Sequence, residues 1–89
     1  MAQVTEYLVH EELSDNYYYD DYVRYNEDDF VVFEEDLQDY IDHLIEFGYK
    51  RIGRHCMVFE KYDDDGDCES EYSVTIKKRV YDVNLAMKP

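Results

Sequence analysis

Several residue types and patterns are scarce in this chain, and each scarcity excludes a class of protein. No apolar run approaches the ~18 residues that a membrane-spanning helix needs, so we expect no transmembrane segment. Residues 1–10 contain no basic stretch followed by an apolar one, which argues against a secretion signal. Proline occurs once, at Pro89, and the chain is rich in aromatic and β-branched residues. This composition predicts a folded protein rather than a disordered one.

Glycine and cysteine are also few. With three glycines and no glycine-rich phosphate loop, an active-site cleft built from mobile loops is not expected. The two cysteines, Cys56 and Cys68, do not make a secreted disulfide framework. If they flank a hairpin that turns at Asp65-Gly66, Cys68 pairs with about residue 63 and Cys56 with about residue 75. Because the two thiols would not then face each other, we expect them to stay reduced in a cytoplasmic protein.

Basic residues are nearly missing from the first half of the chain. The formal net charge is −14, and Arg24 is the one base among residues 1–47, which hold fifteen of the 23 acids. Residues 48–89 hold eight acids and eight bases, so the whole net charge belongs to the first half. Lysine and arginine supply most of the affinity for phosphates and for anionic lipids. The charge therefore argues against direct binding of nucleic acid or membrane, and its asymmetry indicates an interaction surface.

Short segments rich in β-branched and aromatic residues predict the strands. They lie at residues 4–9 and 30–33, then at 49–52 followed by 54–62, and at 72–77, with a further short strand at 80–83. The tyrosine- and aspartate-rich run at residues 15–29 fits either of two structures. Tyrosine and valine favour a strand there, whereas Tyr18, Tyr22 and Tyr25 would share one face of a helix, so its backbone conformation stays open.

One amphipathic helix is predicted at residues 34–47. Its apolar side chains recur at the i, i+3, i+4, i+7, i+8 spacing of a single helical face, namely Leu37, Tyr40, Ile41, Leu44 and Ile45. Acids in the first turn complement the helix dipole, and Gly48 stands where a C′ residue ends a helix. The order strand, strand, helix, strand, strand predicts a single α+β domain over residues 1–89. In it one helix covers one face of an antiparallel sheet of about four strands.

The aspartate run at residues 63–67 predicts a hairpin turn rather than a calcium loop. An EF-hand with Gly66 at its sixth position would place Lys61 at the first position and Tyr72 at the twelfth. Neither side chain supplies the carboxylate oxygens that those positions need.

Cysteine and histidine are not spaced as metal ligands or as a catalytic pair. Cys56, Cys68, His10, His43 and His55 contain no C-x-x-C pair and no histidine pair at ligand spacing. No surrounding motif supports a nucleophilic dyad of Cys56 with His10 or His43. We therefore expect no metal, no cofactor and no catalytic residue, which favours a binding protein over an enzyme.

A row of acids marks the face of the predicted helix opposite its apolar stripe. Glu35, Asp39, Asp42 and Glu46 fall at i, i+4, i+7 and i+11, with no lysine or arginine three or four residues away inside the helix. The row is about 16 Å long with neighbours ~5–6 Å apart, and DNA carries a phosphate every ~3.4 Å along each strand. Like charges at this spacing cost stability, so the row indicates either a phosphate-like binding face or a merely solvated one.

The run that precedes the helix interleaves tyrosines with aspartates. The tyrosines are Tyr17, Tyr18, Tyr19, Tyr22 and Tyr25, and the aspartates are Asp15, Asp20, Asp21, Asp28 and Asp29. A surface of tyrosine and carboxylate complements a groove lined with arginine and lysine, through ion pairs and cation–π contacts. Two or three of these tyrosines are expected to build a tryptophan-free core instead.

In size, acidity and carboxylate spacing, residues 6–46 resemble the small acidic nucleic-acid-mimic inhibitors made by phages and mobile elements. Anti-restriction and anti-CRISPR proteins and inhibitors of uracil-DNA glycosylase belong to this type. The resemblance is one of physical type, without a sequence motif, and these proteins share no common fold. It implies occupation of a basic DNA- or RNA-binding channel on a host defence or chromatin protein, in the host cell cytoplasm if the chain is phage-encoded.

We therefore expect a non-enzymatic inhibitor, monomeric or homodimeric, whose partner is a basic nucleic-acid-binding protein or complex. Two sets of residues form the expected partner-binding site. Carboxylates would stand in for phosphates, namely Glu35, Asp39, Asp42, Glu46, Asp20, Asp21, Asp28 and Asp29, and the packing would come from Tyr17, Tyr18, Tyr19 and Tyr22. The alternative is a general acidic interaction module whose charge serves solubility.

Overall fold

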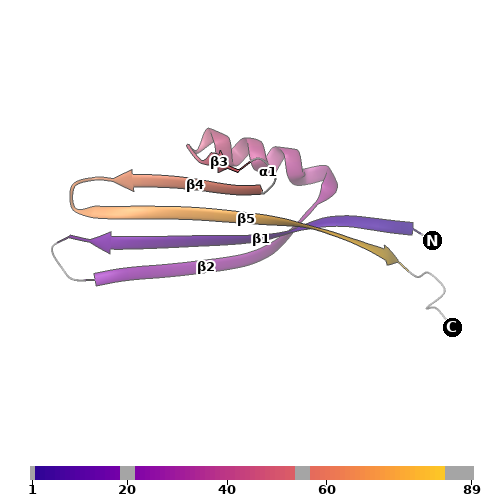
Figure 1. Cartoon of the computed structure of the whole chain (residues 1–89), viewed down its shortest axis with the longest axis horizontal. Helices are drawn as coiled ribbons and strands as arrows, with labels where there is room; N and C mark the ends of the chain where they lie inside the picture. Colours follow the sequence, from indigo (N-terminus) through magenta and orange to yellow (C-terminus); the bar gives the residue numbers. More distant parts are fainter. Residues whose placement is uncertain (1, 19–21, 54–56, 84–89) are drawn as a thin grey trace.

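Five antiparallel strands and one helix make up the part of the chain that the structure describes. The computed structural model describes residues 2–18, 22–53 and 57–83. In chain order the elements are β1 (Ala2–Tyr17), β2 (Tyr22–Phe33), α1 (Glu34–Glu46), β3 (Lys50–Ile52), β4 (Met57–Asp64) and β5 (Cys68–Val83). The strands lie in the order β2-β1-β5-β4-β3 across one sheet, and α1 runs along one of its faces (Figure 1).

The expectation of an α+β fold with one helix and an antiparallel sheet is confirmed, but the strand number and order differ from ββαββ. Three strands follow the helix, because β3 is a separate three-residue edge strand paired with β4. Gly53, with φ at 79°, follows β3 directly. The short strand expected at residues 80–83 is the end of β5, which is 16 residues long.

The first hairpin is much longer than its sequence segments predicted. β1 and β2 pair continuously from Glu6 opposite Phe33 to Tyr17 opposite Tyr22. Within the run at residues 15–29, whose conformation the sequence leaves open, residues 15–17 and 22–29 are therefore strand. Its polar residues are accommodated because side chains alternate between the two faces of a sheet, and one face here is open to solvent.

The second hairpin turns within the predicted aspartate run, but at Gly66-Asp67 rather than at Asp65-Gly66. The Oδ1 atom of Asp65 accepts hydrogen bonds from the backbone N–H groups of Asp67 and Cys68, at 2.9 and 2.7 Å. These bonds centre the loop one residue later than expected. Cys68 consequently lies opposite Asp65 rather than residue 63, with an N–H···O distance of 3.2 Å. Cys56, expected opposite residue 75, lies outside the described residues.

The core lies between α1 and the sheet. Its buried members come from four elements: Tyr7, Val9, Leu44, Phe59, Val74 and Ile76. Three further residues of the predicted helical stripe, Leu37, Tyr40 and Ile41, pack against this cluster.

The helix itself spans residues 34–46, close to the predicted 34–47, and Gly48 follows it with φ at 96°. Ile45 was expected in the buried stripe, and this is wrong because 51% of its surface is exposed. At 100° per residue it lies at the edge of the face that Leu44 centres. A membrane-crossing helix is not found among the described residues, where α1 is short and rich in charge.

Beyond the helix, a buried carboxylate ties three strands together. Asp15 on β1 lies opposite Arg24 on β2 and Ser70 on β5. Its Oδ2 accepts a hydrogen bond from Arg24 Nη2 at 2.8 Å, and its Oδ1 accepts one from Ser70 Oγ at 2.5 Å. The hydrogen bond from Ser70, followed by that from Arg24, holds the pKa of Asp15 below its usual value.

The core assignment predicts an unequal response to truncation. Phe59→Ala lowers the free energy of unfolding by about 3–5 kcal/mol, because Phe59 is 1% exposed and its removal leaves a cavity. Ile45→Ala, on the helix rim, changes it by about 0.5 kcal/mol. Urea unfolding followed by circular dichroism measures both, and equal losses would contradict this core.

The Asp15 tether predicts a pH-dependent contribution. Asp15→Asn lowers the free energy of unfolding at pH 7 by about 1–2 kcal/mol. The pKa of Asp15 in the folded state lies below its unfolded value of about 3.9. The carboxylate therefore stabilises the fold fully above about pH 3.9, and this stabilisation is lost as the pH falls through the folded-state pKa. The gap between parent and variant therefore closes below about pH 4 in urea titrations. Glu71→Gln, an exposed carboxylate on β5, is the control, and a gap that ignores pH argues against the tether.

Candidate functional site

The acidic helix row consists of Glu35, Asp39, Asp42 and Glu46, and all four side chains are exposed on α1. The buried stripe of the same helix faces the sheet, so the row points to solvent. Asp42 accepts a hydrogen bond from Gln38 Nε2 at 2.9 Å. Within the described residues, no lysine, arginine or histidine forms an ion pair with any of the four carboxylates. The structure thus brings these four predicted residues together as a continuous anionic row.

The predicted tyrosines lie elsewhere, at the far end of the first hairpin. Tyr17 ends β1 half-buried and lies opposite Tyr22, where β2 begins. Tyr18 is 46% exposed, and its hydroxyl donates to Asp64 Oδ2 at 2.8 Å. Its backbone N–H donates to Asp67 O at 3.0 Å, so the two hairpin ends lie side by side (Figure 1). The hydrogen bond to Asp64 raises the pKa of the Tyr18 hydroxyl.

The remaining predicted carboxylates are divided among several places. Asp28 and Asp29 are both exposed on β2, but consecutive strand residues point to opposite faces. Asp28 lies opposite Glu11, whose carboxylate accepts a hydrogen bond from Tyr40 of the helix at 3.1 Å. Asp29 points to the other side, the face of the sheet that α1 does not cover, which we call the open face. Tyr19, Asp20 and Asp21 lie outside the described residues.

Within the described residues, one base of the neutral second half pairs with an acid of the first half, and another pairs with an acid of its own strand. Arg79 on β5 forms an ion pair with Glu6 on β1, and Lys61 lies 3.4 Å from Asp63 within β4. Four other bases, Lys50, Arg51, Lys77 and Lys78, make no ion pair within the described ranges. Among the described residues, the ion pairs thus lie on the sheet, and the acids of the helix row take part in none.

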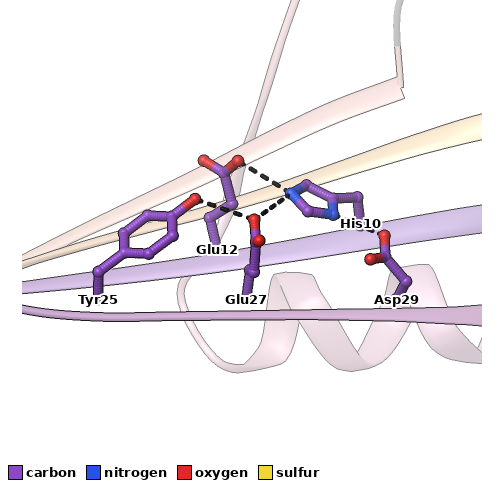
Figure 2. Close-up of polar contacts among 5 residues, drawn as sticks. All are labelled: His10, Glu12, Tyr25, Glu27 and Asp29. Carbon is purple, nitrogen blue, oxygen red and sulfur yellow. Dashed lines mark hydrogen bonds and ion pairs between the residues drawn. The ribbon is translucent and has the colours of Figure 1, made fainter.

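The open face carries a polar cluster that sequence reasoning missed (Figure 2). His10 Nδ1 lies 2.6 Å from Asp29 Oδ1, while His10 Nε2 lies 2.9 Å from Glu12 Oε1 and 3.5 Å from Glu27 Oε2. Tyr25 donates its hydroxyl to Glu27 Oε2 at 3.2 Å. We call these five residues the His10 cluster. Their period of two, His10-x-Glu12 on β1 and Tyr25-x-Glu27-x-Asp29 on β2, was visible in the sequence, but the register that joins them was not.

The electrostatics of the His10 cluster follow from its carboxylates. Hydrogen bonds to Asp29 and then to Glu12 raise the pKa of His10 above its ordinary value. Desolvation, followed by hydrogen bonds to Glu12 and Glu27, raises the pKa of Tyr25 to about 12. The cluster offers one imidazole and three carboxylates, which are groups that hold a cation. It contains no serine or cysteine nucleophile.

A shallow hollow of about 660 Å³ borders this cluster on the open face. Its lining includes Glu12 and Tyr25 together with Glu60, Tyr62 and Glu71. Lys50 and Lys61 also line it, so acids, tyrosines and two lysines surround the space next to the cluster.

Comparisons with protein-family models, with curated proteins and with solved structures gave no match to this chain. The residues described above are thus the basis for assigning a function.

The unneutralised helix row predicts that folding stability improves when a charge in it is reversed. Asp39→Lys replaces repulsion by attraction towards Glu35 and Asp42, which raises the free energy of unfolding by about 0.5–1 kcal/mol. Urea unfolding at low salt measures the gain, which shrinks at 1 M salt, where the Debye length is ~3 Å. Asp39→Asn is the control and yields a smaller gain. A loss of stability would mean that the row has partners within the fold.

Proposed function

We propose that this chain is a non-enzymatic inhibitor that occupies the basic nucleic-acid-binding site of another protein by mimicking nucleic acid. The observation that carries the proposal is the helix row: four exposed carboxylates on one rigid element, with no cationic partner in the described residues. A regular line of charge on a helix presents anions at fixed intervals, as a phosphate backbone does.

The position of the row in the fold supports this proposal. Leu37, Tyr40, Ile41 and Leu44 anchor the helix on the sheet, so the row is held in place by the core. Its charges repel each other at a cost of a few tenths of a kcal/mol per pair, and such a cost is retained where it serves a function. Arginines and lysines in a groove would relieve this repulsion on binding, so association would be fast and salt-dependent.

The tyrosines take a secondary part in the proposal. Tyr18 is 46% exposed, which leaves its ring accessible to a partner. Tyrosine offers a large contact area with few rotatable bonds, and its ring attracts arginine and lysine. Because Tyr18 lies at the hairpin end, it would contact the rim of the groove rather than the part that holds the helix row.

A displacement assay tests the function. Basic nucleic-acid-binding proteins are purified from a bacterial lysate on heparin and loaded with fluorescent DNA or RNA. The chain is expected to displace the nucleic acid from at least one of them, with an apparent affinity that falls steeply between low and physiological salt. Simultaneous binding of chain and nucleic acid, or displacement that ignores salt, would rule out mimicry.

Two matched triple variants distinguish the contribution of the helix row to displacement from that of net charge alone. The triple variant Asp39→Asn, Asp42→Asn, Glu46→Gln is expected to weaken displacement about tenfold or more, at roughly 0.5 kcal/mol per charge. The control Glu60→Gln, Asp67→Asn, Glu71→Gln removes the same number of exposed charges from the sheet and the second hairpin. An equal loss of displacement in the two triple variants would favour the alternative, in which the acidic charge serves general solubility.

A further inference from the structure

The donor atoms of the His10 cluster are spaced like the ligands of a metal ion. His10 Nε2, one Glu12 oxygen and one Glu27 oxygen all lie within 4.8 Å of one another. The two contacts of His10 Nε2, at 2.9 and 3.5 Å, bracket the ~3.4 Å between ligands of a tetrahedral ion with bonds of about 2.0–2.2 Å. Figure 2 shows the three side chains converging from β1 and β2.

Strand pairing makes this arrangement costly for the protein alone. Glu12 lies directly opposite Glu27, and like charges directly opposite each other in a sheet are destabilising. Asp29, opposite His10, adds a third carboxylate to the same patch. A divalent cation between Glu12 and Glu27 would convert their repulsion into attraction and join the middle of the first hairpin.

The second nitrogen of His10 is already oriented as it is in metal sites. Metal-binding histidines almost always donate their other ring N–H to a carboxylate or carbonyl, which fixes the tautomer and the ring. Here Asp29 Oδ1 lies 2.6 Å from His10 Nδ1, so Nε2 is the nitrogen left to face Glu12 and Glu27. Tyr25 supports Glu27 in the same way, through its hydroxyl. A cluster of acids alone would lack this oriented imidazole.

We propose that His10 Nε2, Glu12 and Glu27 bind a divalent transition-metal ion of the zinc class, with Asp29 as the positioning residue for the histidine. One imidazole and two carboxylates are nitrogen and oxygen donors that suit zinc, and three protein ligands leave a fourth position open. Glu12 also lines the hollow on the open face, so the open position adjoins space for water or a small ligand. The helix row lies on the other side of the sheet, and the proposal does not depend on it.

Zinc titration tests the site without any partner. The full chain carries Cys56→Ser and Cys68→Ser, so that thiolates do not bind the ion, and affinity is measured by competition with a chromophoric chelator. One equivalent of Zn²⁺ is expected to bind and to raise the melting temperature. Co²⁺ as a second probe is expected to give visible bands of a four- or five-coordinate site, and zinc is expected to shift the imidazole resonances of His10.

Each residue has a matched control. His10→Gln and Glu27→Gln are expected to abolish tight binding of Zn²⁺. Asp29→Asn is expected to lower the affinity for Zn²⁺ about 10–100-fold, which is typical when a metal-binding histidine loses its positioning partner. His43→Gln removes an exposed histidine on the helix, and Asp28→Asn removes a neighbouring carboxylate on the other face of β2. Both controls are expected to leave the affinity unchanged.

Three results would overturn the site. The first is zinc affinity that survives His10→Gln in a folded variant, as judged by circular dichroism. The second is equal loss in Asp28→Asn and Glu27→Gln, which would mean that general acidity attracts the ion. The third is that the parent chain binds no tight equivalent of Zn²⁺. His10 would then serve as the counter-ion of the three carboxylates.

Discussion

The pairing of β1 with strands on both sides is the constraint on which the rest of this structure depends. β1 pairs with β2 from Glu6 to Tyr17 and with β5 over all of its 16 residues. The register fixes which side chains point to α1 and which to the open face, since faces alternate along each strand. Tyr7 and Val9 thereby join the core, while His10 and Glu12, which follow Val9 on the strand, point away from it. A slip of one residue would bury His10 and expose Val9.

The two faces of the sheet divide the charge of the chain into two kinds of surface. On the helix side, the core holds α1 by its apolar stripe, and Glu35, Asp39, Asp42 and Glu46 remain as an exposed row without cationic partners in the described chain. On the open face, carboxylates from β1 and β2 gather around one histidine. The first arrangement suits a long cationic groove and the second suits a single cation, so the same excess of acid supports two distinct proposals.

Bases on neighbouring strands stabilise the two acids that the sheet buries, Glu6 and Asp15. Arg79 pairs with Glu6, and β5, which carries Arg79, is the long neighbour of β1. Arg24, the single base of residues 1–47, lies against the buried carboxylate of Asp15, with Ser70 on the other oxygen. Where the fold buries an acid it supplies a donor. The helix row has no cationic partner in the described chain because it faces solvent, where a carboxylate without an ion pair stays hydrated.

The sequence by itself determined the elements with strong local signals. The stripe from Leu37 to Leu44 predicted α1, because helical periodicity depends only on residues a few positions apart. Asp65-Gly66 predicted the second hairpin through its local turn chemistry, and the exposure of the helix row followed from the position of its residues opposite that stripe. Residues 15–29, rich in both tyrosine and aspartate, gave no single answer, and the isolated stretches 4–9 and 30–33 did not reveal one long hairpin.

The tertiary structure alone decided the register, and with it the His10 cluster. Glu12 and Glu27 are fifteen positions apart in the chain, and they meet because β1 and β2 pair in one register out of several that the sequence permits. The pairing of β1 with β5 and of β5 with β4 likewise places Tyr18 beside Asp64, far from the helix row. Long-range pairing depends on the packing of whole strands against α1 and β5, which no short segment of sequence contains.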